Sequence, residues 1–201
     1  MTMTRSRALM TVATLATLAA LAGCGGGDNP LDNPTSVQNP AGSGGRKLSF
    51  VYFQKCINPI LLARITSSSG TSTCASAGCH DNVAGTGGAL RVVPGATEVD
   101  LSDPALTPDL LRATDMYKNF YTAQGVTAIG APTQSRLLNK PLVLGTLHGG
   151  GLIFDSAQDN FPSRIRYWIA RPVPEGQDEF STVGNNMFTP PDPQTGTCNA
   201  E

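Results

Sequence analysis

The chain has 201 residues, of which 40% are hydrophobic, 6% aromatic and 14% charged, and its formal net charge is −1. This length fits one domain, and without a basic excess the chain has no electrostatic footprint for nucleic acid. The 22 Gly and 15 Pro predict a loop-rich fold, and a total of two His excludes a histidine-rich metal cluster.

The first 23 residues have the layout of an export signal. Two arginines precede an apolar run at 8–22, which is too short to span a bilayer. The run ends in Leu-Ala-Gly-Cys, which resembles the lipobox of bacterial lipoproteins. The resemblance implies cleavage before Cys24, acylation of Cys24 and anchoring to the lipid bilayer of the cell envelope. Because Gly25 is not an acid, it also implies the outer membrane, with the protein facing the periplasm. An ordinary secretory peptide that ends in cysteine is the alternative.

Residues 24–46 are predicted to be a disordered tether behind the acylated cysteine. Positions 25–46 contain six Gly and three Pro and almost no apolar side chains. Such a segment cannot bury enough apolar surface to become ordered. The folded domain is therefore expected over 47–182, and residues 183–201 are expected to form an irregular tail.

The hydrophobic pattern of the domain predicts an all-α fold with long irregular loops. Apolar residues at helical spacing predict two short helices or one kinked helix over 48–65. The Ser/Thr/Gly-rich stretch at 66–73 is expected to be a loop. Further helices are predicted over 107–124, 135–139 and 160–170.

The most specific motif is formed by Cys74, Cys79 and His80, which give the spacing C-x-x-x-x-C-H. The haem c attachment motif is C-x-x-C-H. Its two thiols add to the two vinyl groups of haem, and the adjacent imidazole coordinates the iron. The longer spacing leaves open whether both cysteines are attached or Cys79 alone.

Several short segments around this motif resemble, in order, the bacterial monohaem c-type cytochromes of the planctomycete-type family. The resemblance spans about 48–172 and implies a cytochrome c-like domain with one haem c. The implied function is single-electron transfer, not enzymatic catalysis. Its redox partner proteins remain unidentified from sequence. Besides the cysteine motif, the segments that carry the resemblance are 53–61, 87–92, 135–141, 148–151 and 167–169.

The sixth ligand of a haem iron is predicted to be His148. It precedes the final predicted helix, where class I cytochromes place their distal ligand, and three glycines follow it. The alternatives are Met116, Met187 and an open site, which would suit a peroxidase-like enzyme or a sensor of small ligands. Arg91 is a candidate contact for a haem propionate or, equally, a solvated surface residue.

The remaining cysteines, Cys56 and Cys198, are predicted to form a disulfide, because exported proteins rarely keep free thiols. A bridge between Cys56 and Cys74 is the alternative. Two readings without haem also stay open. One is a structural or binding lipoprotein with a Cys74–Cys79 disulfide. The other is a zinc site of Cys74, Cys79, His148 and Cys56.

Overall fold

The computed structural model describes residues 45–182 and 186–201. The predicted signal segment 1–23, the acylation site Cys24 and the tether as far as residue 44 lie outside the described residues. Within the described part of the chain, no helix combines the length and the apolar character needed to cross a membrane.

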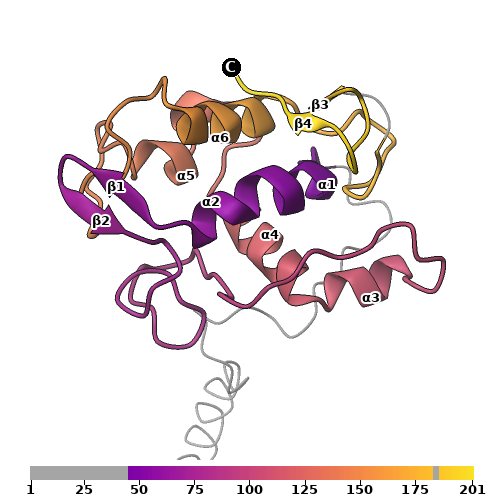
Figure 1. The fold of residues 1–201 in the computed structure, drawn as a ribbon, viewed down its shortest axis with the longest axis horizontal. Coiled ribbons are helices and arrows are strands. Elements are labelled where there is room, and N and C mark those ends of the chain that lie inside the picture. The colour runs from indigo at the N-terminus through magenta and orange to yellow at the C-terminus, as the bar shows by residue number, and fades with distance from the viewer. Residues whose placement is uncertain (1–44, 183–185) are drawn as a thin grey trace, which may run out of the picture. The chain divides into compact units, whose positions relative to one another are not determined.

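A continuous helical segment runs through the middle of the fold (Figure 1). It consists of α1 (Phe50–Tyr52), a wider π-helical turn η1 (Phe53–Ile57) and α2 (Asn58–Leu62). Ser49 caps its start, since its side chain accepts a hydrogen bond from the Tyr52 amide. The wide turn ends at Ile57, two positions before Pro59, which has no N–H and so cannot complete a regular ladder of helical hydrogen bonds. Of the two possibilities predicted for 48–65, two short helices or one kinked helix, the structure has one unbroken helical stretch over 50–62, with the wide turn in its middle.

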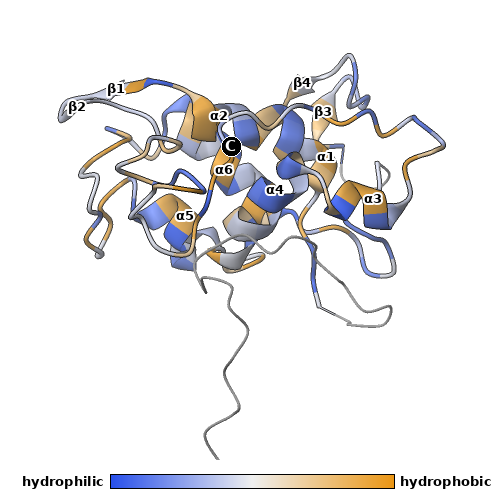
Figure 2. Ribbon diagram, turned by 90° about the horizontal axis from the view of Figure 1, so that it is seen from below, coloured by the Kyte–Doolittle hydropathy of each residue, from blue (hydrophilic) through white to orange (hydrophobic). Residues whose placement is uncertain are grey.

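Aromatic rings fix this segment against two later helices, α4 (Asp115–Gly125) and α6 (Asn160–Ala170). The ring of Phe53 lies 5.5 Å from that of Phe120 on α4 and 5.4 Å from that of Trp168 on α6. The Trp168 indole N–H also donates to the Ser49 carbonyl at 2.9 Å. Since each helix carries both hydrophobic and hydrophilic residues (Figure 2), its apolar side can face this shared core.

The predicted helix over 107–124 is divided into α3 (Pro108–Arg112) and α4. Thr107 caps α3, and Thr114 caps α4 by accepting from the Tyr117 amide. A second threonine cap so close to the first starts a new helix and redirects the chain. A 3-10 turn, η2 (Pro132–Gln134), then precedes α5 (Arg136–Asn139), and both α5 and α6 form where they were predicted.

The expectation of an all-α fold is wrong, because the structure is mixed α and β. Helices make up about 31% of the described residues and strands about 8%. In the first of two small antiparallel sheets, β1 (Ile65–Ser67) pairs with β2 (Gly70–Ser72), in the stretch expected to be a loop. Gly70 adopts φ +123°, a conformation that favours glycine, and so lets the short chain reverse. Two strands of three residues each are too short to show a clear hydrophobic period.

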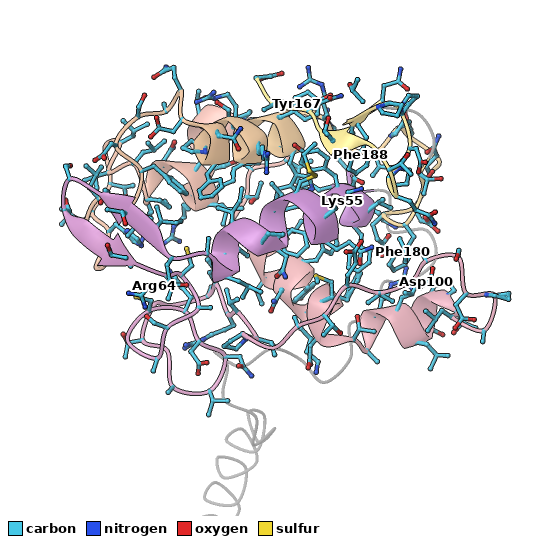
Figure 3. The ribbon with its side chains drawn as sticks, viewed as in Figure 1. Lys55, Arg64, Asp100, Tyr167, Phe180 and Phe188 are labelled. Atoms are coloured by element: carbon cyan, nitrogen blue, oxygen red, sulfur yellow. A yellow bond between two sulfur atoms is a disulfide. The ribbon has the colours of Figure 1, made fainter. Side chains whose placement is uncertain are left out.

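The second sheet lies near the C-terminus, where β3 (Phe188–Thr189) pairs with β4 (Thr197–Cys198). The predicted disulfide between Cys56 and Cys198 is confirmed, with their Cα atoms 5.9 Å apart. Phe188 lies between the labelled residues Lys55 and Tyr167 in Figure 3, and the Lys55 ammonium is 5.6 Å from the Phe188 ring centroid. The last residues are thus held against η1.

A buried carboxylate ties the chain after α6 back to the helices. The Glu179 side chain is 1% exposed, and its Oε1 accepts from Arg112 at 3.0 Å and from the Tyr117 hydroxyl at 2.9 Å. The Lys47 ammonium lies 3.3 Å from Oε2. Burial acts to raise the pKa of Glu179, but its backbone N–H, Tyr117, Arg112 and Lys47 together hold that pKa below its usual value. The charged form of this buried carboxylate is therefore stabilised.

Candidate functional site

Four of the residues singled out from the sequence line one cavity of about 470 Å³, a volume typical of cofactor sites. Cys74, Cys79 and His80 come from the loop after β2, and His148 comes from the loop between α5 and α6. The remaining walls are mainly apolar, with side chains that include Ile60, Leu61, Val126, Leu137, Phe154 and Ile165. The fold thus gathers two thiols and two imidazoles in an apolar chamber.

The two histidine rings are parallel and separated. Their centroids lie 6.2 Å apart and their planes differ by 12°. A transition-metal ion binds an imidazole nitrogen at about 2.0–2.1 Å, and the ring centroid lies about 1.1 Å beyond that nitrogen, so two imidazoles on opposite sides of one ion have centroids about 6.3 Å apart. The separation of His80 and His148 therefore matches that of a ligand pair flanking one metal ion.

Hydrogen bonds fix the tautomer of both rings. Nδ1 of His80 lies 3.0 Å from the Leu90 carbonyl oxygen, and Nδ1 of His148 lies 2.8 Å from that of Gly151. A carbonyl oxygen can only accept, so each Nδ1 carries the hydrogen and donates it. Each Nε2 is then left with a free lone pair, which is the arrangement of a metal-ligating histidine.

Burial also keeps His80 in the neutral form that binds metals. Desolvation lowers its pKa, and the electrostatic influence of His148, Arg91 and Lys140 acts in the same direction. The hydrogen bond to Leu90 opposes this shift but does not reverse it. At neutral pH the His80 imidazole is therefore uncharged and ready to coordinate.

The loop that carries His80 is built around close backbone contacts. The His80 amide donates to the Cys74 carbonyl at 2.9 Å, which folds the five-residue spacing into a compact turn. The Gly87 amide donates to the Cys79 carbonyl at 2.7 Å. A Cβ on Gly87 would lie 2.6 Å from that carbonyl oxygen and would collide with the His80 ring. Glycine at position 87 therefore lets the chain pass directly against the imidazole.

The loop that carries His148 is closed at its base. The amides of Ile153 and Phe154 both donate to the Pro141 carbonyl, at 2.8 and 3.2 Å. At its tip, the Gly151 amide donates to the His148 carbonyl at 2.9 Å, while the ring bonds to the Gly151 carbonyl. These contacts fix the direction in which the His148 ring points.

The hairpin β1–β2 braces the same loop from outside. The Ser67 hydroxyl donates to the Leu152 carbonyl at 2.8 Å. At the hairpin turn, the Ser68 amide and hydroxyl both donate to the Asp155 carboxylate, at 2.9 and 2.6 Å. The hairpin that was not predicted thus supports the position of His148.

Cys74 and Cys79 are both free thiols, and both are half-buried. Burial, together with the neighbouring Cys79, raises the pKa of the Cys74 thiol to about 11. Neither a Cys74–Cys79 nor a Cys56–Cys74 disulfide is formed. The Cys74 thiol is therefore protonated at neutral pH, and neither cysteine is consumed by a disulfide, so both are free for covalent attachment of a ligand.

The donor set does not suit a metal ion held by protein ligands alone. Across residues 45–182 and 186–201, no three side chains of His, Cys, Asp or Glu come close enough together to bind one ion. A structural zinc site requires four such ligands. Two facing imidazoles instead suit a metal whose other ligands are supplied by a macrocycle.

The other candidates lie elsewhere. Met116 and Met187 are 2% and 6% exposed, belong to the hydrophobic core and are not among the cavity-lining residues. Arg91 is also outside the cavity wall, and its guanidinium donates to the carbonyls of Gly85 and Asp81, which closes the loop after the motif. The two cations that do line the cavity, Arg136 and Lys140, were missed. The available signal was their four-residue spacing, with Arg136 on the helix predicted over 135–139 and Lys140 directly after it.

Comparison of the chain with protein-family models, with curated proteins and with solved structures finds no match. The functional conclusion must therefore come from the residues of this cavity.

Proposed function

We propose that this protein is a monohaem c-type cytochrome that carries single electrons in a bacterial cell envelope. The observation that supports this most directly is the parallel pair of His80 and His148, 6.2 Å apart in a cavity that also contains two free thiols. The volume, the free Nε2 lone pairs and the thiols are all compatible with a covalently bound haem.

Each residue has a role in this proposal. Cys74 and Cys79 would hold the cofactor through thioether bonds, in which each S–H adds across one vinyl group and leaves sulfur on one vinyl carbon and hydrogen on the other. A bound haem supplies reversible one-electron chemistry at its iron. His80 and His148 would both ligate the iron, which would favour electron transfer over oxygen chemistry. The apolar walls exclude water from the site.

Localisation belongs to the same proposal and is supported by the sequence before residue 45. Cys24 anchors the mature chain to the bilayer through its acyl groups. The expected membrane is the outer membrane, with the protein facing the periplasm. More than one acyl chain is needed for stable attachment. A Cys24→Ser variant should lose acyl labelling and membrane retention while it keeps its haem.

The decisive test is covalent haem on protein matured with a cytochrome c assembly system. Haem should remain on the chain in a denaturing gel, and the pyridine haemochrome spectrum should distinguish two thioethers from one. Cys74→Ser should convert the two-thioether spectrum to the one-thioether form. Cys198→Ser, a cysteine variant outside the cavity, is the matched control and should retain the wild-type spectrum. Absence of haem from exported wild-type protein would refute the proposal.

The axial ligands are tested by spectroscopy of the same protein. Wild-type ferric protein should be low-spin and six-coordinate. His148→Ala should become high-spin and bind added imidazole, whereas Met187→Leu should remain low-spin. A high-spin wild-type spectrum would contradict the assignment of His148 and would favour a site for small ligands.

A further inference from the structure

The cavity contains a charge asymmetry that the iron ligands and thiols do not explain. Its lining residues include two cations, Arg136 and Lys140, and no carboxylate. Arg136 is on α5 and Lys140 is the C-cap of that helix, so the two side chains lie on one face, four residues apart. One wall of a mainly apolar chamber is therefore positively charged.

These cations have no anionic partner in the described chain. The ion pairs among residues 45–182 and 186–201 involve the cations Lys47, Arg112, Lys118 and Arg171. Lys140 is nevertheless half-buried, where an uncompensated ammonium is costly. An anion supplied by a ligand would provide the missing charge.

The wall that presents the two cations is firmly positioned. Ser135, which is 0% exposed, accepts from the Ala128 amide through its hydroxyl at 2.9 Å, and the Leu137 amide donates to the Val126 carbonyl at 3.2 Å. Lys140 is followed directly by Pro141, whose carbonyl closes the His148 loop. The cations therefore lie at the base of the loop that presents an iron ligand.

We propose that Arg136 and Lys140 bind the two carboxylates of the cofactor, so that this wall fixes which edge of the macrocycle enters the cavity and keeps those carboxylates ionised. The inference rests on the proposed function, because haem carries its two vinyl groups and two propionates at different edges. The thiol-bearing loop receives the vinyl groups, and α5 receives the propionates. An Arg side chain can bind a carboxylate through two parallel hydrogen bonds, and a Lys adds a point charge.

The consequence is electrostatic. The titratable and charged side chains that line the cavity are Cys74, Cys79, His80, His148, Arg136 and Lys140. The first four are used in attachment and coordination, so only the two cations can compensate propionate charge. Without them, negative charge near the iron would stabilise its ferric form and lower the midpoint potential. A propionate would also take up a proton more easily, which makes the potential depend on pH.

The experiment uses full-length haem-loaded protein and measures covalent haem content together with midpoint potential from pH 5 to pH 8. Arg136→Gln/Lys140→Gln should keep its haem but show at least a tenfold lower equilibrium constant for reduction, about 59 mV for one electron. It should also gain a pH-dependent segment that the wild type lacks. Arg64→Gln is the matched control, because Arg64 is an exposed cation outside the cavity (Figure 3).

Each outcome has a separate meaning. If the double Gln variant keeps the wild-type potential and pH profile, the carboxylate contact is refuted and the cytochrome proposal stands. If wild-type protein carries no haem, the proposed function fails and this inference fails with it. If the double Gln variant loses haem, the charge-preserving variants Arg136→Lys and Lys140→Arg show whether the positive charge or only the side-chain packing is needed. Wild-type haem content and potential in these variants support the contact, whereas equal loss of haem refutes it.

Discussion

Removal of the Cys56–Cys198 disulfide should destabilise the protein without changing the electronic properties of the cavity. The bridge joins residues 142 positions apart, and the loop-closure model gives about 5 kcal/mol for a loop of that length at 25 °C. Cys56 is completely buried in η1, and neither cysteine lines the cavity. The effect should therefore fall on stability alone.

The observed loss should be smaller than the model value, because other contacts hold the C-terminal hairpin. The Tyr52 hydroxyl donates to the Asn199 carbonyl, and the Lys55 ammonium donates to the Gln194 carbonyl at 2.7 Å. We expect a decrease of about 2–5 kcal/mol in the free energy of unfolding. For a domain of this size that corresponds to a decrease in Tm of about 5–20 °C.

The assay compares wild type with Cys56→Ala/Cys198→Ala by thermal and guanidinium unfolding, each with and without a phosphine reductant. Reductant should bring the wild type to the stability of the double variant and should not affect the double variant further. The midpoint potential of haem-loaded protein should be the same in both. Equal stability of wild type and double variant would refute the role given to the bridge. A changed midpoint potential would refute the conclusion that the disulfide does not influence the cavity.

Three further predictions concern other contacts. Glu179→Gln should cost about 2–3 kcal/mol at neutral pH, because it leaves the half-buried Lys47 and Arg112 without their buried carboxylate, whereas the exposed Glu175→Gln should have no effect. The pKa of Glu179 in the folded state lies below its ordinary value of 4.5, so the stabilisation by this carboxylate is complete above pH 4.5 and is lost as the pH falls through the folded pKa. The stabilities of wild type and Glu179→Gln should therefore converge in acid, and denaturation curves that remain separate there would contradict this. His148→Met should raise the midpoint potential, as measured by spectroelectrochemistry, because thioether ligation favours ferrous iron, and an unchanged value would argue against His148 as a ligand. Asp155→Asn should weaken the hold of Ser68 on the His148 loop and speed imidazole binding in stopped flow, and an unaltered rate would show that the hairpin does not brace the ligand.

Local sequence patterns were sufficient to predict an element wherever the residues that stabilise it are close to one another along the chain. α6 has the predicted bounds, because apolar residues at helical spacing and Pro162 near its start act within a few residues. The hairpin β1–β2 was missed, since its stability comes from Leu152 and Asp155, which lie about 85 residues away along the chain. No window of sequence around the hairpin contains that information.

The sequence by itself identified the reactive side chains of the candidate site. Cys74, Cys79 and His80 lie within seven consecutive positions, so any fold must bring them close together. It also limited the candidates for a second ligand of the proposed iron to a few residues, and its pairing of Cys56 with Cys198 is confirmed. These conclusions depend on residue type and count, which folding does not change.

Only the tertiary structure decided which distant residues face that motif. Packing of Met116 and Met187 into the core left His148 opposite His80. It also placed Arg136 and Lys140, not Arg91, in the cavity wall. Long-range neighbours are set by how helices and loops bury their apolar sides and satisfy their backbone hydrogen bonds, and this is a property of the whole fold.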